Sequence, residues 1–254
     1  MNVPVLMYHR VRPATERSAP CDFVITANTL RRQLNYLVAR GYQTPTIGTV
    51  LTRPAALKTV RPVLITFDDG YLDNYTEALP LLLEYGLRAT VFAVAERRRI
   101  NFWDKGVPTA NAKLMQRGQL REMAAAGMEI GAHGITHRRL DAISDDDARR
   151  ELKDSKAVLE DVIGAAVDYF AYPFGAVSER VKDLTREAGY RAAFAVNSGP
   201  FDFHADPFEI RRVLISDRAD DTYLYAKTSG LEKAARTSTS FWRSLVTSTM
   251  RVGS

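Results

Sequence analysis

Cysteine is almost absent from this chain: Cys21 is the single cysteine among 254 residues. One cysteine excludes an internal disulfide, so nothing in the sequence requires an oxidising compartment. We expect Cys21 to be a small buried apolar residue and not a nucleophile, because no other feature of the sequence argues for a reactive thiol.

Long apolar runs are missing as well, and no stretch approaches the roughly 18 residues that suggest a membrane-spanning helix. The opening segment has no basic region ahead of its apolar run, and that run ends at His9 and Arg10, too early for a signal peptide. We therefore expect a protein that is cytoplasmic or peripheral to the inner membrane face, unless a leader precedes this sequence.

A strong excess of one charge is also lacking, since 35 Lys and Arg stand against 30 Asp and Glu. Most of the net charge of +5 falls in residues 211–254, which leaves the first 210 residues nearly neutral. A nucleic-acid-binding protein normally carries a basic face, so we expect no nucleic-acid partner. The hydrophobic share of 46% and the charged share of 26% are ordinary for a globular enzyme.

Short apolar runs typical of buried strands alternate with longer amphipathic patterns typical of helices. The expected strands are 3–8, 61–67, 89–94, 129–132, 169–172 and 192–196, with a last apolar run at 209–216. The expected helices are 29–42, 74–86, 118–128, 145–164 and 178–190. This alternation predicts an α/β fold with a parallel sheet that is either open or closed into a barrel.

Polar residues gather where the expected strands end, which is where ligands bind in parallel α/β folds. Asp68 and Asp69 follow one strand, His133 follows another with His137 four residues later, and His9 follows the first. Each group alone has an ordinary explanation, as a turn with a helix cap or as surface or core histidines. Together, two imidazoles and one carboxylate form the three-ligand set of a catalytic metal site, and a second carboxylate can deprotonate water there.

Three motifs in order, TFDDGY (66–71), HGITH (133–137) and AYPFG (171–175), resemble the polysaccharide deacetylase family. The resemblance implies a distorted (β/α) barrel in a single domain, a divalent metal that is most often zinc, and hydrolysis of the acetamide of N-acetylated sugars. We assign residues 1–231 to this catalytic domain. Residues 232–254 form a basic Ser/Thr-rich tail that either docks as a helix or stays loose.

Carried over position by position, the resemblance implies roles for five residues. Asp68 would be the base, and the metal ligands would be Asp69, His133 and His137. The backbone N–H of Phe174 would help to hold the oxyanion.

Three departures from the family pattern need an explanation. Gly134 stands where a Ser or Thr usually follows the first histidine, so one hydrogen bond near the metal is missing. The Arg that often precedes the Pro-aromatic-Gly turn is absent, and Arg212 is the best candidate to replace it. The C-terminal leucine-x-histidine motif, which supplies the catalytic acid in many members, is also absent; His204 is expected at the surface.

The opening VPVLMYHRV (3–11) resembles that of the biofilm poly-N-acetylglucosamine deacetylases, whose domain looks circularly permuted. His9 is therefore the candidate acid, and the alternative is a histidine buried and hydrogen-bonded under the barrel rim.

Aromatic residues near these motifs are candidates for substrate contact. Trp103 lies in an irregular segment where it could stack on a sugar ring or serve only in packing. We expect Tyr71, Tyr172 and Pro173 to line the substrate site as well.

The sequence leaves two other functions open. One is a metal-dependent amidohydrolase acting on a non-sugar C–N bond, with the same metal chemistry. The other is a catalytically silent sugar-binding domain, which the missing C-terminal histidine favours and the intact Asp68 disfavours. The expected partner is an N-acetylated carbohydrate, and the oligomeric state is unknown.

Overall fold

A parallel seven-stranded sheet forms the centre of the described part of the chain, as the alternating pattern predicted. All of its strand pairs are parallel, and nearly all strand residues are buried, as expected where helices cover the outer face. In sheet order the strands are β10 (Ala192–Phe194), β9 (Tyr169–Ala171), β8 (Glu129–Ala132), β7 (Thr90–Ala93), β6 (Leu64–Asp69), β1 (Val5–Tyr8) and β11 (Val213–Leu214).

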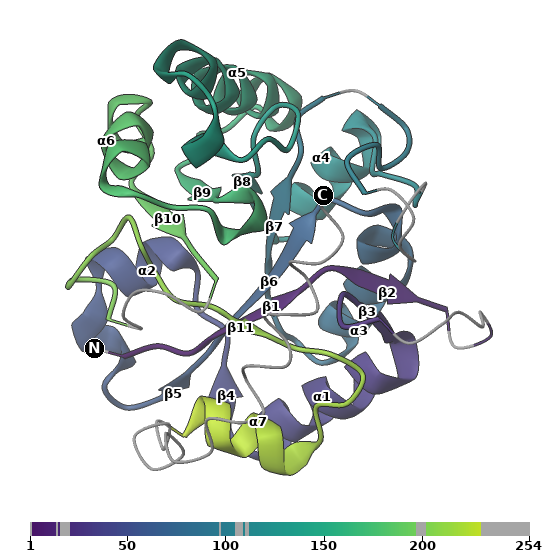
Figure 1. Ribbon diagram of the computed structural model, residues 1–254. Helices are drawn as coiled ribbons and strands as arrows, with labels where there is room; N and C mark the ends of the chain where they lie inside the picture. The colour runs from purple at the N-terminus through teal and green to yellow at the C-terminus, as the bar shows by residue number, and fades with distance from the viewer. Residues whose placement is uncertain are drawn as a thin grey trace, which may run out of the picture.

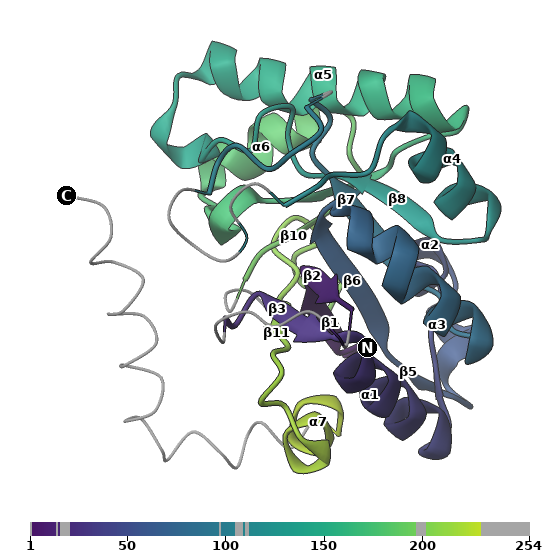
Figure 2. The same ribbon diagram turned by 90° about the vertical axis from the view of Figure 1, so that its right-hand side faces the viewer.

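Helices surround the curled sheet in the computed structural model (Figure 1). The predicted helices are α1 (Ala27–Ala39), α3 (Leu79–Glu84), α4 (Arg117–Ala125), α5 (Asp145–Ile163) and α6 (Glu179–Glu187). Two further helices that the pattern did not predict are α2 (Ile47–Thr52) and α7 (Asp221–Thr228). Figure 2 shows α1, α3 and α4 alongside the strands, with α5 and α6 beyond β8 and β10. This arrangement is the distorted (β/α) barrel that the motifs implied.

The segment 207–214 closes the barrel by joining its two edges. Its first half pairs with β10, because Ala193 N–H donates to the Pro207 carbonyl and Ala195 N–H to the Ile210 carbonyl. Its second half, β11, pairs with β1. The run 209–216 was expected as one strand, but only Val213–Leu214 forms regular ladder bonds because the segment changes partner midway.

The expected helix 74–86 is divided. It begins as a π-helical turn at η2 (Asn74–Ala78) and continues as α3, with Pro80 in the first turn of α3. Proline has no N–H to donate and its ring crowds the preceding turn, so the regular α-helical bonds cannot run through this point.

Short elements complete the fold. Two small parallel ribbons pair β2 (Arg10–Arg12) with β3 (Val24–Thr26) and β4 (Tyr42–Gln43) with β5 (Arg61–Pro62). The 3₁₀ turns are η1 (Pro54–Leu57), η3 (Leu140–Ala142) and η4 (Pro173–Gly175).

The structure describes residues 2–13, 15, 21–96, 98–104, 109, 112–196 and 202–229. The tail at 232–254 lies outside the described residues, and the domain boundary at 231 stays a prediction. No helix within the described ranges is long and apolar enough to cross a membrane. Cys21 is half-buried, not fully buried as expected, and burial raises the pKa of its thiol.

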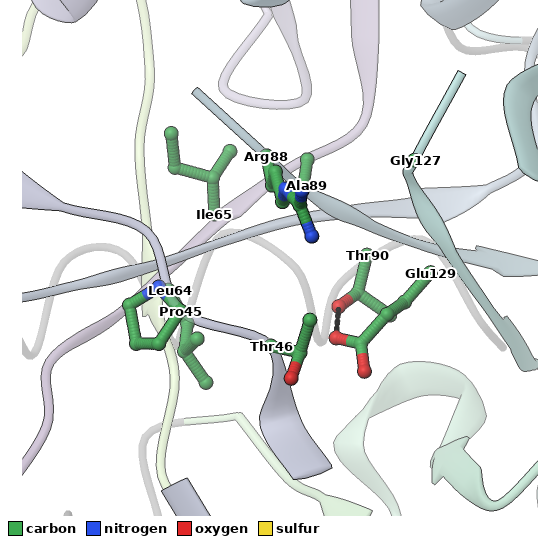
Figure 3. A pocket seen from close by; sticks show the side chains of 9 residues that line it. All are labelled: Pro45, Thr46, Leu64, Ile65, Arg88, Ala89, Thr90, Gly127 and Glu129. Carbon is green, nitrogen blue, oxygen red and sulfur yellow. Dashed lines mark hydrogen bonds between the residues drawn. The ribbon is translucent and has the colours of Figure 1, made fainter. Parts of the chain in front are cut away.

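A small cavity lies at the amino-terminal ends of β6, β7 and β8, at the opposite end of the strands from Asp68 and His133 (Figure 3). It has a volume of about 10 Å³, enough for about one water molecule. Glu129 there accepts hydrogen bonds from the Ile47 N–H at 2.9 Å and the Thr90 hydroxyl at 3.0 Å. These bonds fasten the start of α2 to the sheet, which is a structural role.

Candidate active site

Asp69, His133 and His137 converge at the carboxyl ends of β6 and β8. Asp69 Oδ1 lies 3.2 Å from His137 Nε2 and 3.5 Å from His133 Nε2, and the three ligand atoms lie within 4.8 Å of one another. Donor atoms around a tetrahedral zinc, each about 2.0–2.1 Å from the ion, lie about 3.3 Å apart. Asp69 Oδ1 is also buried without a hydrogen-bond partner among the described residues, so the donor set fits a divalent metal.

A hydrogen bond at Nδ1 of His133 orients its ring so that Nε2 is available to bind a metal. Its Nδ1 lies 2.7 Å from the Ala171 carbonyl oxygen. A carbonyl only accepts, so Nδ1 carries the proton and Nε2 presents its lone pair to the site. Burial lowers the pKa of His133 to about 4, which keeps the ring neutral near pH 7.

Asp68 and Asp69 are neighbours in β6, and successive side chains of a regular strand point to opposite faces. Asp69 escapes this rule because its φ of 72° lies in the left-handed region, and both carboxylates lie within 4 Å of His133 Nε2. Among the described non-glycine residues, His137 and Phe174 alone share a positive φ, each 60°. Such strain costs about 1–3 kcal/mol per residue and tends to gather at functional sites.

Arg212 holds Asp68 with a two-pronged ion pair inside the barrel. Its Nη1 and Nη2 donate to Asp68 Oδ1 and Oδ2 at 2.5 and 2.7 Å, and both side chains are buried. Burial alone would raise the pKa of Asp68, but the charge of Arg212 and smaller contributions from nearby groups hold that pKa below its usual value. Arg212 therefore occupies the place that the sequence assigned to it, beside a carboxylate that is ionised.

His9 lies on the same rim as the two carboxylates. Tyr8 is in register with Phe67, so His9 follows β1 where Asp68 stands in β6. The Nδ1 atom of His9 is buried and has no hydrogen-bond partner within the described residues.

Glu151 of α5 is a site residue that the sequence analysis missed. Its Oε2 accepts from the Ile135 and Thr136 N–H groups at 2.8 and 2.9 Å, and its Oε1 accepts from the Thr136 hydroxyl. The side chain is buried and organises the loop between His133 and His137, the two candidate ligand histidines. Its position in the sequence could have predicted its burial, because Glu151 falls on the helix face otherwise formed by buried residues such as Ala148 and Leu152.

Gly134 and Glu151 explain one departure from the family pattern together. Gly134 has a φ of 80°, and a Cβ there would come within 2.9 Å of Glu151 Oε2. The glycine at position 134 therefore leaves space for the Glu151 carboxylate, which accepts the hydrogen bonds of the loop at 135–136.

Comparison with known proteins identifies the family. The model of the family named polysaccharide deacetylase matches residues 57–193, a range that contains all three motifs. The chain belongs to the polysaccharide deacetylase family. This family of hydrolases acts on C–N bonds other than peptide bonds, so the expected enzyme class is confirmed.

Several polysaccharide deacetylase relatives cover most of the chain. The Bacillus subtilis (strain 168) protein YxkH is 26% identical over 216 residues, 84% of this chain and 71% of that protein. The poly-beta-1,6-N-acetyl-D-glucosamine N-deacetylase of Staphylococcus aureus is 24% identical over 241 residues, 84% of this chain and 79% of that protein. The structure of Streptococcus pyogenes deacetylase PplD in complex with acetate shares the fold at a TM-score of 0.75 and 22% identity, covering 90% and 98% of the two chains.

The Pro-aromatic-Gly turn of the family is η4, which follows β9. Pro173 is buried and lies beside Gly134, whereas the Phe174 side chain is 54% exposed. The Gly175 N–H donates to the Tyr172 carbonyl at 2.8 Å, which holds the turn closed. The role of the Phe174 N–H toward an oxyanion stays a prediction.

The expected substrate contacts of two tyrosines are at odds with their burial. Tyr71 and Tyr172 are both 0% exposed. The Tyr71 hydroxyl accepts from Asn101 at 2.7 Å, and the Tyr172 hydroxyl donates to the Phe208 carbonyl at 2.9 Å. Both rings therefore support the loops around the site from within.

Trp103 and His204 complete the set of sequence predictions. Trp103 lies against His137, with ring centroids 4.6 Å apart and planes 25° from parallel. One face of the indole is therefore occupied by His137, a candidate metal ligand. His204 is exposed, as expected.

Replacing Arg212 is expected to shift the pH dependence of turnover. Without the guanidinium, burial dominates and the pKa of Asp68 rises, so the base becomes protonated at a lower proton concentration. The acidic limb of the kcat/KM profile of Arg212→Met should therefore move to higher pH. Arg212→Lys, which keeps the charge without the two-pronged geometry, should shift less. Arg218→Met, at an exposed position, is the control, and an unchanged profile for Arg212→Met would contradict the assignment.

Removing Glu151 is expected to weaken metal binding without touching a ligand. Glu151→Ala leaves three loop donors unsatisfied and frees the loop that carries His137, so the metal dissociation constant should rise by about tenfold or more. Chelator competition measures this constant in the absence of substrate. Asp154→Ala, an exposed acid on the same helix, is the control. Equal affinities for the Glu151 and Asp154 variants would show that the loop does not need the carboxylate.

Proposed function

We propose that this polysaccharide deacetylase uses a divalent metal to remove acetyl groups from N-acetylated sugar units, with N-acetylglucosamine as the unit. The observation that carries the proposal is the convergence of Asp69, His133 and His137 beside an ionised Asp68 at the mouth of the barrel. The name of the Staphylococcus aureus relative, an N-acetylglucosamine polymer deacetylase, supports the choice of sugar.

The reaction is the hydrolysis of an acetamide. Water attacks the carbonyl carbon, the C–N bond breaks, and acetate and a free sugar amine are released. A divalent metal bound by Asp69, His133 and His137, which we expect to be zinc, supplies Lewis-acid polarisation of the carbonyl and of the attacking water.

Asp68 accepts the proton of the attacking water. Its low pKa means that the carboxylate is ready near neutral pH, and the Arg212 fork fixes its direction. The N–H of Phe174 supports the charge that develops on the carbonyl oxygen.

The departing nitrogen needs a proton, because an amide anion is too poor a leaving group at neutral pH. His9 is the proposed donor. Its backbone is anchored by Asn74, whose side chain donates to the His9 carbonyl at 2.7 Å. Its ring packs against the Phe23 ring in a T-shaped arrangement, with ring centroids 4.8 Å apart. Asp68, once protonated, is the alternative donor.

Two other functions use the same site. A metal-dependent amidohydrolase would cleave a non-sugar C–N bond, whereas a silent sugar-binding domain would bind without cleavage. The buried pair of Arg212 and Asp68 disfavours the silent domain, because binding alone does not require an oriented base.

Acetate release tests the proposal directly. Zinc-loaded protein should release acetate from N-acetylglucosamine oligomers. Asp68→Asn should keep the metal but lose about 10²–10⁴-fold in turnover, because the base is missing. Asp69→Asn should lose the metal itself. Metal analysis of both variants separates the roles, and equal metal loss would contradict the assignment of the acid pair.

Sugar binding without acetate release would favour the silent domain, and cleavage of cyclic amides alone would favour the amidohydrolase.

Replacing His9 tests the proton donor. His9→Ala should keep the metal content and the fold yet lose at least about tenfold in kcat/KM, a small effect for a general acid because Asp68 partly replaces it. The exposed His204 offers a matched control, since His204→Ala should be unaffected. An undiminished rate for His9→Ala would leave Asp68 as both base and acid.

A further inference from the structure

The two metal-ligand histidines are held in different ways. His133 has the hydrogen bond that such ligands ordinarily have, from Nδ1 to the Ala171 carbonyl. His137 Nδ1 is buried, and none of the described residues offers it a hydrogen bond. His137 also has a left-handed backbone with φ of 60°, a conformation that persists only when its surroundings fix it. Within the described residues, contacts other than a hydrogen bond orient this imidazole.

Aromatic rings enclose His137. The Trp103 indole stacks on it with centroids 4.6 Å apart, and the Phe174 ring meets its edge at the same separation. His133 lies across from it at 4.8 Å. With one face stacked and two further rings packed against it, the imidazole cannot turn about its side-chain bonds without disturbing these contacts.

The backbone that carries Trp103 is anchored independently of His137. The Trp103 backbone N–H donates to Asn101 Oδ1 at 3.0 Å, and Asn101 Nδ2 donates to the Tyr71 hydroxyl at 2.7 Å and to Asp104 at 2.8 Å. Asn101 and Tyr71 are buried, and Tyr71 follows the Asp68–Gly70 motif directly. The loop that carries Trp103 is thus tied to the segment that carries Asp69.

We propose that Trp103 is a positioning residue that holds His137 in its metal-binding orientation by ring stacking, in place of a hydrogen-bond partner. This inference rests on the metal site of the proposed function. Binding of a dication withdraws electron density from the imidazole, and an electron-poor ring stacks more favourably on an electron-rich indole. Trp103 therefore favours the metal-bound state of His137.

Metal affinity tests the proposal without substrate. The zinc dissociation constant of Trp103→Leu, measured by chelator competition, should rise about tenfold, the low end of the effect of lost support around a metal ligand. Trp103→Phe keeps a smaller stacking ring and should lie between Trp103→Leu and the unaltered protein. Phe23→Leu is the matched control, since Phe23 contacts His9, which is not a ligand, and its zinc affinity should not change. Circular dichroism of the metal-free proteins verifies that each variant is folded.

Fluorescence supplies a second readout. The chain has two tryptophans, Trp103 and Trp242, so Trp103 is the sole indole in a Trp242→Phe protein. Its emission should change on zinc titration and reach a plateau at one equivalent.

Several outcomes overturn the proposal. It fails if Trp103→Leu binds zinc as tightly as the unaltered protein, or if the fluorescence emission of Trp103 does not change during the zinc titration. A higher KM for N-acetylglucosamine oligomers with unchanged zinc affinity would make Trp103 a sugar platform instead. If zinc and Trp103 behave as expected but no acetate is released, the proposed function fails and this inference stands.

Discussion

Arg212 reaches through the barrel interior to Asp68, joining segments 144 residues apart in the chain. The guanidinium also lies near the Ala195 carbonyl, to which its Nε donates at 3.3 Å, so it contacts the ends of β6 and β10 together. A buried ion pair contributes little net stability compared with apolar residues of the same shape. Its value here is electrostatic: it allows a carboxylate to stay ionised beside two imidazoles and a second carboxylate, in a place where burial would otherwise neutralise it.

Much of the site could be predicted because it depends on strand ends. The carboxyl ends of β1, β6 and β8 meet at one rim, so local motifs in the sequence sufficed to place His9, Asp68 and His133 together. The α/β fold class could be predicted because the alternation of buried strands and amphipathic helices is visible in the sequence itself. The Arg212 contact was predictable only through resemblance, since no local signal distinguishes it from Arg211.

Other features depend on tertiary packing and could not be predicted. The left-handed backbone of Asp69 follows from contacts around the strand end and not from its residue type, which rarely requires that conformation. The place of Glu151 on the buried face of α5 indicates burial, but its hydrogen-bond partners exist only once the loop at 134–137 lies against it. The burial of Tyr71 depends on Asn101, and the sequence shows an aromatic residue but not the side of the loop to which it turns. The split pairing of 207–214 arises because one segment must bridge two edges.

The closing of the barrel by 207–214 has a consequence for biosynthesis. β1 is made among the first residues, but its neighbours are completed only when residues 64–69 and 213–214 have been made. Contacts this distant in sequence form late, and an unpaired strand edge remains exposed until then. A nascent chain still lacking Arg212 holds Asp68 without the counter-charge of its buried ion pair.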